Sequence, residues 1–294
     1  LGTRTMQVSK KALIFGIDSF TGSYLKQSFE NQGIEVVGTT FFHKNSPTYC
    51  NITNFLECAQ FVQSIIPDYV VNLSGISFVP HIDYRQIYDV NFNGAVNILK
   101  ACEEHVPDCK LLLVSSGQIY ASSPDAINES YELKLSNHYA VSKHSMERVA
   151  ILSSLDVKIA RSFNYTGVGQ DSRFLIPKIV SHYKDAKISI TLGDIDVYRD
   201  FSDVRDVTDA YLSILFSDSN EKIFNVCSNN IYSIADILSF LNQECGYEIN
   251  VDQSAEFMRS NIVRSVKGDN SRLKKLGWNA KRSFFDTLKW MLHG

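Results

Sequence analysis

The side chains best suited to chemistry in this sequence are a tyrosine and a lysine four residues apart, Tyr139 and Lys143. In a helix that opens near Asn137, this spacing places both side chains on one face. A lysine ammonium there favours the phenolate and lowers the pKa of the tyrosine from its usual value of about 10. Ser116 follows a predicted strand at 111–114 and could bind the same carbonyl or hydroxyl oxygen. These three residues predict proton exchange with an oxygen atom.

The same spacing recurs at Tyr183 and Lys187, so one of the two pairs is incidental. We favour Tyr139 and Lys143 because a serine-rich strand end precedes them, in the half of the chain whose pattern predicts a parallel sheet. The alternative for this pair is a solvated pair on a helix surface.

The elements that must position these residues follow a regular rhythm in the first half of the chain. Short apolar runs alternate with helix-length amphipathic segments, which predicts repeated βαβ units. Nearly continuous apolar runs suit parallel strands covered on both faces, so we expect a Rossmann-like doubly wound parallel sheet that binds ligands at the carboxyl ends of its strands. The predicted strands are 12–15, 34–37, 69–73, 111–114 and 157–160.

After about residue 165 the pattern changes to that of a smaller mixed α/β lobe. No Pro/Gly-rich linker marks the change, so the expected boundary between domains 6–165 and 166–294 is soft. The elements predicted in this lobe are helices 175–184, 206–216 and 233–245 and strands 188–192 and 223–226.

A glycine-containing turn follows the first predicted strand and opens a helix. A strand, a tight turn and a helix amino terminus together suit the binding of a pyrophosphate. Ser19 stands where a GxxGxxG pattern has its middle glycine, and the alternative is an ordinary βα turn. The candidate cofactor residues in this turn are Gly16, Asp18, Ser19, Phe20, Thr21 and Gly22.

The end of the second predicted strand has no carboxylate to hold the ribose 2′-hydroxyl of NAD. Thr39, Thr40, His43 and Lys44 could instead donate hydrogen bonds to a 2′-phosphate, which favours NADP(H) over NAD. The alternative is a solvated loop of ordinary polar residues.

Composition excludes several other functions. A net charge of −3 without long runs of like charge argues against nucleic acid and against a membrane surface. The six cysteines form no CxxC pair or Cys/His cluster, so we expect no metal site and no disulfide framework. No stretch approaches the ~20 apolar residues of a membrane helix, and we expect a cytoplasmic protein whose natural start is Met6.

Taken together, these motifs resemble the extended short-chain dehydrogenase/reductases, which place Ser/Thr, Tyr and Lys in this order. The segments 72–75, 91–94 and 161–167 resemble further elements of that family. The resemblance implies Ser116, Tyr139 and Lys143 as catalytic residues. It also implies contacts to the dinucleotide from Asn51, Leu73, Ser74, Gly75, Asn91, Tyr139 and Lys143, although Asn51 stands where the family commonly has an acid.

The second half narrows the resemblance to the nucleotide-sugar branch, particularly the GDP-4-keto-6-deoxymannose reductases, through segments 164–170, 192–194, 199–207 and 268–273. An arginine there could grip a diphosphate bidentately, whereas the alternative is surface ion pairing worth ~0–1 kcal/mol. The substrate residues implied by the resemblance are Ser77, Ser116, Gly117, Gln118, Asn164, Arg199 and Arg259.

For the reaction, the resemblance implies hydride transfer between a nicotinamide and sugar C4 while Tyr139 exchanges a proton with O4. The related 4,6-dehydratases use a glutamate two places after the Ser/Thr, but this chain has Gln118, whose amide cannot act as a base. We therefore predict NADPH-dependent reduction of a 4-keto-6-deoxy sugar nucleotide, with bacterial glycan precursor synthesis as the implied setting. The alternatives are an NAD-dependent 4-epimerase or dehydratase of a sugar nucleotide and, in another class, a noncatalytic NADP-binding regulatory protein. Helices around 86–104 and 139–153 resemble the family's dimer helices, so we expect a homodimer.

Overall fold

The computed structural model describes residues 9–77, 83–254 and 265–294, and these form two compact units. Unit 1 comprises 1–115, 136–160 and 214–222. Unit 2 comprises 116–135, 161–213 and 223–294. The chain therefore passes between the units several times. No helix among the described residues is long and apolar enough to cross a membrane, and those residues contain no group of three potential metal ligands.

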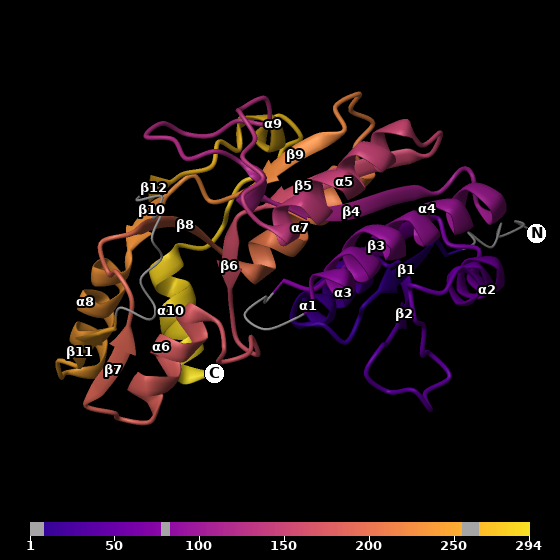
Figure 1. The fold of residues 1–294 in the computed structure, drawn as a ribbon. Helices are drawn as coiled ribbons and strands as arrows, with labels where there is room; N and C mark the ends of the chain where they lie inside the picture. The colour runs from indigo at the N-terminus through magenta and orange to yellow at the C-terminus, as the bar shows by residue number, and fades with distance from the viewer. Residues whose placement is uncertain (1–8, 78–82, 255–264) are drawn as a thin grey trace, which may run out of the picture. The chain divides into compact units, whose positions relative to one another are not determined.

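A six-stranded sheet is the largest element of the fold, with strand order β2-β1-β3-β4-β5-β9 (Figure 1). Its β1 pairs in parallel with β2 and β3, and β3 with β4, which confirms the Rossmann-like parallel sheet. The last strand was expected among the elements of the second lobe, but it extends this sheet beyond β5. The strands are β1 Lys11–Phe15, β2 Glu35–Thr39, β3 Tyr69–Asn72, β4 Lys110–Ser116, β5 Asp156–Ser162 and β9 Ile223–Val226.

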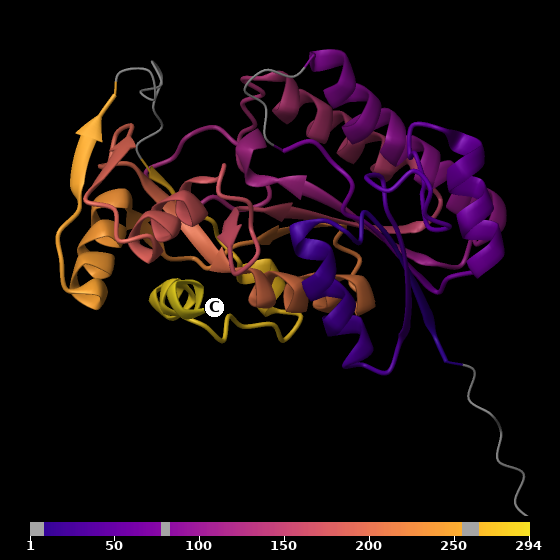
Figure 2. The same cartoon turned by 90° about the horizontal axis from the view of Figure 1, so that it is seen from below.

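The helices of unit 1 cover both faces of its part of the sheet. Figure 2 shows α1 on one face and α2, α4 and α5 on the other, as a doubly wound fold requires. Three of these helices begin at side-chain caps, which satisfy backbone N–H groups that have no helical partner: Ser19, Asn54 and Asn137. The elements are α1 Phe20–Glu30, α2 Phe55–Ile65, α3 Tyr84–Tyr88, a π-helical turn Asp89–Asn93, α4 Gly94–His105 and α5 His138–Leu152.

Unit 2 has its own core and two small sheets, β10-β8-β12 with β6 on β8, and β11-β7. Its core contains Ile179, Ile237, Leu241 and Leu288, all fully buried. The predicted helices and strands of this part are confirmed within two residues at each end. Besides β9, the predicted elements are α6 Leu175–Lys184, β7 Ser189–Leu192, α7 Val204–Phe216 and α8 Ile234–Cys245. The elements that were not predicted are β6 Asn164–Thr166, β8 Tyr198–Asp203, β10 Ile231–Ser233, β11 Asn250–Gln253, β12 Ser265–Val266, α9 Ser271–Lys274 and α10 Phe284–His293.

Candidate active site

Tyr139 and Lys143 both lie in the first half of α5, where the sequence places them. The side chain of Asn137 accepts a hydrogen bond from the Ala140 amide at 2.8 Å and fixes the start of the helix, so that Tyr139 belongs to its first turn. Both side chains are buried, with 8% of Tyr139 and 7% of Lys143 exposed. The Lys143 Nζ lies 6.0 Å from the centre of the Tyr139 ring. The structure therefore brings the two predicted groups together.

The ammonium of Lys143 is held against the sheet. Its Nζ donates to the carbonyl oxygen of Val114 on β4 at 2.9 Å. Burial lowers the pKa of Lys143 to about 8, and the carboxylate of Glu147 acts in the opposite direction. At pH 7 the group is still charged in roughly nine molecules of ten. A buried charge of this kind beside a phenol can stabilise the phenolate.

Glu147 is a site residue that the sequence reasoning missed. It is almost fully buried, and its Oε1 accepts a hydrogen bond of 2.5 Å from the hydroxyl of Ser115 on β4. The signal was present in the spacing, because residues 139, 143 and 147 form a series of steps of four along one helix face. Ser115 thus contributes to this buried cluster, while Ser116 follows it as the last residue of β4 and belongs to unit 2.

The loop after β3 is fastened to the same region by Asn91. This side chain accepts from the Ile76 amide at 2.7 Å and donates to the Ile76 carbonyl at 3.1 Å and to the Ser142 hydroxyl at 3.2 Å. A Cβ added at Gly75 would lie 3.2 Å from both Asn91 Oδ1 and Lys143 Nζ. Asn91 itself sits in the π-helical turn, an irregularity that is common at functional sites.

The remaining predicted residues of this loop contribute in different ways. The Leu73 amide donates to the Phe15 carbonyl at 2.9 Å, which extends the β1–β3 pairing by one residue. The Ser74 amide donates to the side chain of Asn72 at 3.0 Å. Ser77 is exposed at the end of the loop.

The glycine turn between β1 and α1 has the geometry of a dinucleotide-binding turn. Gly16 has φ +83°, and its amide and that of Ile17 donate to the Thr39 carbonyl on β2. A Cβ at Gly16 would lie 2.9 Å from the Ser74 hydroxyl, and one at Gly22 would lie 2.2 Å from the Ile17 carbonyl oxygen. Glycine is thus required at both ends of the motif, at the first by backbone conformation and at the second by close packing.

The middle position of the motif, occupied by Ser19, does not require a glycine. Its φ is −71°, an ordinary value for any residue, and its hydroxyl oxygen accepts from the Gly22 amide at 3.2 Å. The serine is therefore the N-cap of α1, a role for which serine is among the preferred residues. Phe20 and Thr21 form the first turn of this helix, at the carboxyl end of β1.

A carboxylate from an earlier part of the chain lies at the end of β2, where the sequence predicted none. The hydroxyl of Thr40 donates to the carboxylate of Asp18, which arrives from the glycine turn. Thr39 and Thr40 are buried, whereas His43 and Lys44 are exposed. Of the residues proposed for a 2′-phosphate, His43 and Lys44 are therefore accessible, and the Asp18 carboxylate lies close to the strand end that they follow.

Asn51 takes part in a local turn that leads into α2. Its side-chain oxygen accepts from the amide and hydroxyl of Thr53, at 3.1 and 2.9 Å. Its own amide donates to the carboxylate of Glu57 at 2.7 Å. An acidic side chain is thus present in this loop although position 51 itself is neutral.

In unit 2 the predicted substrate residues lie near one strand, β8. Asn164 is exposed on β6 and donates weakly to the Asp200 carbonyl at 3.4 Å. Asp200 is fully buried and accepts hydrogen bonds from Ser228, Asn229 and Gly268. Burial raises the pKa of its carboxyl group to about 6, although these hydrogen bonds act to lower it. Its neighbour Arg199 is only partly buried, as expected for alternate residues of a strand. Asp200 is therefore a structural residue of this unit and Arg199 is the one presented at its surface.

Three other predicted substrate residues, Ser116, Gly117 and Gln118, lie at the end of β4. Ser116 caps the short 3₁₀ turn 117–119 by accepting from the Gln118 amide at 3.1 Å, and the Gln118 side chain is exposed. Gly117 is buried against the ring of Phe163. Arg259 lies outside the described residues.

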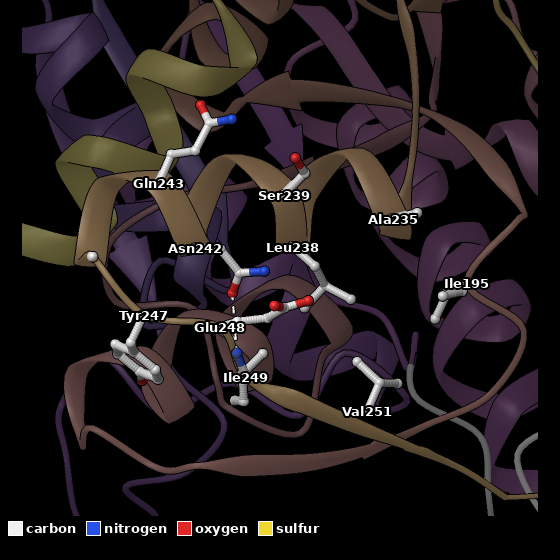
Figure 3. A pocket seen from close by; sticks show the side chains of 11 residues that line it. Ile195, Ala235, Leu238, Ser239, Asn242, Gln243, Tyr247, Glu248, Ile249 and Val251 are labelled. Atoms are coloured by element: carbon white, nitrogen blue, oxygen red, sulfur yellow. Dashed lines mark hydrogen bonds between the residues drawn. The ribbon is translucent and has the colours of Figure 1, made fainter.

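A hollow of about 560 Å³ lies elsewhere in unit 2, along α8 and β11 (Figure 3). Apolar side chains including Leu238, Ile249 and Val251 line it together with Asn242, whose Oδ1 accepts from the Ile249 amide at 3.2 Å. None of the predicted substrate residues that the structure describes lines this hollow.

The chain is similar to a known protein family over most of its length. The model of the NAD dependent epimerase/dehydratase family matches residues 12–227. The chain belongs to this family. The match covers the glycine turn, Ser116, Tyr139, Lys143 and β9, the last strand of the six-stranded sheet. It confirms the resemblance to the extended short-chain dehydrogenase/reductases.

Two curated relatives and one solved structure narrow the comparison. The chain is 29% identical over 269 residues to a GDP-6-deoxy-D-talose 4-dehydrogenase of Aggregatibacter actinomycetemcomitans, covering 90% of each chain. It is 31% identical over 242 residues to the GDP-6-deoxy-D-mannose reductase of Pseudomonas aeruginosa, covering 77% of this chain and 80% of the relative. The structure of RMD from Pseudomonas aeruginosa complexed with NADPH superimposes with a TM-score of 0.85 at 26% identity, over 97% of this chain and 98% of that one.

The residues of unit 1 fit a nicotinamide dinucleotide. The positive φ of Gly16, the lack of room for any side chain at Gly22 and the capped amino end of α1 suit a pyrophosphate. Near Lys143, the glycine at position 75 leaves the backbone of the β3 loop uncovered. The glycine turn could therefore hold the pyrophosphate in the middle of such a dinucleotide.

Proposed function

We propose that this protein uses NADPH to reduce the C4 ketone of a nucleotide-diphosphate 4-keto-6-deoxyhexose, with GDP as the favoured nucleotide. The observation that carries the proposal is the buried Tyr139–Lys143 pair on α5, in a chain about 30% identical to two enzymes named for GDP-6-deoxyhexoses. D-Talose and D-mannose differ in configuration at C4, so the two relatives are named for products of opposite C4 stereochemistry. A common 4-ketone accounts for both names.

A reduced nicotinamide dinucleotide, which the glycine turn and the loop around Gly75 would hold, would provide the hydride for C4. The Tyr139 hydroxyl supplies the proton that O4 needs to become a hydroxyl group, and the resulting phenolate recovers its proton from solvent. Lys143 stabilises that phenolate, because its charge is held by the Val114 carbonyl and cannot move away. Ser116 at the end of β4 donates a hydrogen bond to the same oxygen.

The second unit would bind the nucleotide-diphosphate part of the substrate. Arg199 is the strongest described candidate for the diphosphate, because its side chain is partly exposed on β8 and a guanidinium can bind two phosphate oxygens at once. Gln118 replaces the acid of the dehydratases, which leaves reduction rather than dehydration as the outcome.

The proposal is tested by mixing the purified protein with NADPH, or with NADH, and a panel of 4-keto-6-deoxy sugar nucleotides carrying GDP, dTDP, CDP or UDP. Loss of absorbance at 340 nm with one member supports the reductase and identifies its nucleotide. Consumption with none of them refutes the reductase.

A second candidate, an NAD-dependent 4-epimerase, is favoured by one observation, the Asp18 carboxylate at the end of β2. A carboxylate there suits the free ribose hydroxyl of NAD and repels a 2′-phosphate. Conversion of a sugar nucleotide into its C4 epimer, seen by NMR without net cofactor consumption, would select this candidate.

We further propose that the protein is a homodimer formed through α4 and α5. Light scattering at micromolar concentration tests this, and a monomeric mass refutes it.

A further inference from the structure

A buried acid lies next to the proposed reactive pair and has no part in the reaction described above. Glu147 is 1% exposed, so its charge must be compensated within the protein, because burying an uncompensated carboxylate is costly. One compensating contact is the 2.5 Å hydrogen bond from Ser115. A positive charge that acts on it is that of Lys143, one helical turn earlier on the same face of α5.

Glu147 and Lys143 each form a hydrogen bond with β4, to neighbouring residues of the strand. Lys143 donates to the carbonyl of Val114, and Ser115, the next residue of β4, donates to Glu147. Two successive residues of one strand thus fix two side chains that are one turn apart on one helix. This arrangement holds α5 in a single register against β4 and holds the ammonium under Tyr139.

The charges on the surrounding elements do not replace that of Glu147. The charged side chains of α3, the π-helical turn and α4 are exposed to solvent, which screens them. Cys102 of α4 is buried, but its hydrogen bond with Cys109 and its burial raise the pKa of the thiol, so it carries no charge at neutral pH. At the far end of β4, Lys110 pairs with Asp218 at 2.8 Å. The exposed set comprises Tyr84, Arg85, Asp89, Lys100, Glu103 and Glu104, with Tyr88 and His105 partly buried.

We propose that Glu147 is a positioning residue whose buried carboxylate keeps the Lys143 ammonium charged and in place beside Tyr139. Burial alone favours the neutral amine, which cannot support a phenolate. The carboxylate opposes this effect. The inference rests on the proposed function for the role of Lys143, but the interaction itself can be measured without any substrate.

The test is a double-mutant cycle on the cofactor-free protein. The free energy of unfolding is measured by urea denaturation from pH 6 to pH 11 for the wild type, Lys143→Met, Glu147→Gln and the double variant. The free energy of unfolding of the wild type minus that of Lys143→Met, plotted against pH, reports the titration of Lys143 when Glu147 is present. The same difference between Glu147→Gln and the double variant reports the titration of Lys143 when Glu147 is absent. Glu104→Gln on α4 is the matched control, since it removes the same charge at an exposed position.

The expected result is a midpoint near pH 8 in the wild-type background that falls by about one unit or more in the Glu147→Gln background. The control should leave it unchanged. Equal midpoints with and without Glu147, or an equal shift from Glu104→Gln, would overturn the inference. If Glu147→Gln does not fold, Ser115→Ala combined with Glu147→Met replaces both hydrogen-bonding partners by apolar groups and allows the same measurement.

Activity gives a second readout once a substrate is known. The alkaline limb of the kcat profile should move to lower pH by the same amount in Glu147→Gln, with KM changed less than about twofold. A change in KM with an unmoved pH profile would contradict a positioning role. A shifted Lys143 midpoint in a protein that reduces no member of the substrate panel refutes the proposed function and leaves the inference standing.

Discussion

Replacing Lys143 by methionine should stabilise the cofactor-free protein while abolishing its activity. The pKa of Lys143 lies at about 8 in the folded protein, against 10.5 without the fold. This difference of about 2.5 units corresponds to about 3 kcal/mol by which the folded protein disfavours the charged form, with the attraction to Glu147 already included. Methionine keeps the length of the side chain and removes the buried charge.

The loss of one hydrogen bond offsets part of this gain. The Val114 carbonyl loses the Lys143 donor, which costs about 1 kcal/mol. The net stabilisation at pH 7 is therefore about 2 kcal/mol, equivalent to a rise of about 3 °C in the melting temperature for a protein of 294 residues.

The stability difference between the wild type and Lys143→Met should change with pH in a defined direction. Between pH 8 and pH 10.5 the unfolded wild type binds a proton at Lys143 that the folded protein does not, so the wild type gains stability relative to the variant as the pH rises. The advantage of Lys143→Met should be largest well below pH 8, should disappear near pH 9.5, and above about pH 10.5 the variant should be less stable than the wild type by about 1 kcal/mol, the cost of the lost hydrogen bond. Thermal melting of both proteins across pH 6–11, without cofactor, measures this.

A second buried lysine of unit 1 provides the control. Lys158 is 4% exposed, but its Nζ lies 3.3 Å from the carboxylate of Asp156 and donates to the Ser219 carbonyl. Lys158→Met should therefore lower the melting temperature. A Lys143→Met protein that is less stable than the wild type at pH 7, or whose advantage does not change with pH, would refute the reasoning.

Three further predictions concern the reaction and the cofactor. Tyr139→Phe should lower kcat by roughly a thousandfold and change the dissociation constant of NADPH, measured by fluorescence, less than about threefold; activity above a tenth of the wild type would contradict the role of Tyr139. Asp18→Asn should raise the affinity for NADPH relative to NADH by about tenfold, because it removes a negative charge near the 2′-phosphate, and an unchanged ratio in binding titrations would remove Asp18 from cofactor selection. Gly22→Ala places a Cβ 2.2 Å from the Ile17 carbonyl and should lower both the melting temperature and the affinity for either cofactor; an alanine variant with wild-type binding would show that this turn tolerates a side chain.

The sequence predicted much of the fold because its signals are local. The apolar runs of β1, β3 and β4 are too continuous for exposed strands, and strands buried on both faces must lie in a parallel sheet covered by helices. The spacing of Tyr139 and Lys143 likewise follows from helix geometry alone. The position of β9 could not be predicted in this way, because a four-residue apolar run does not indicate which sheet it joins.

The cofactor turn shows where local patterns mislead. Ser19 looked like a defect in the glycine motif, but the backbone at this position has an ordinary φ and the hydroxyl caps α1. The absence of an acid after β2 also had a different meaning in three dimensions. Asp18 lies 22 residues before Thr40 in the chain, and only the β1–β2 pairing brings the two side chains together.

The sequence by itself determined the βαβ rhythm, the glycine turn and the order of Ser116, Tyr139 and Lys143, since each depends on residue types at short separations. Only the tertiary structure decided what surrounds these residues. Burial of Lys143 and its contacts with β4 and Glu147 set its charge, and these depend on strand and helix meeting in one register. Electrostatic energies inside a protein depend on distance and desolvation, neither of which a linear pattern contains.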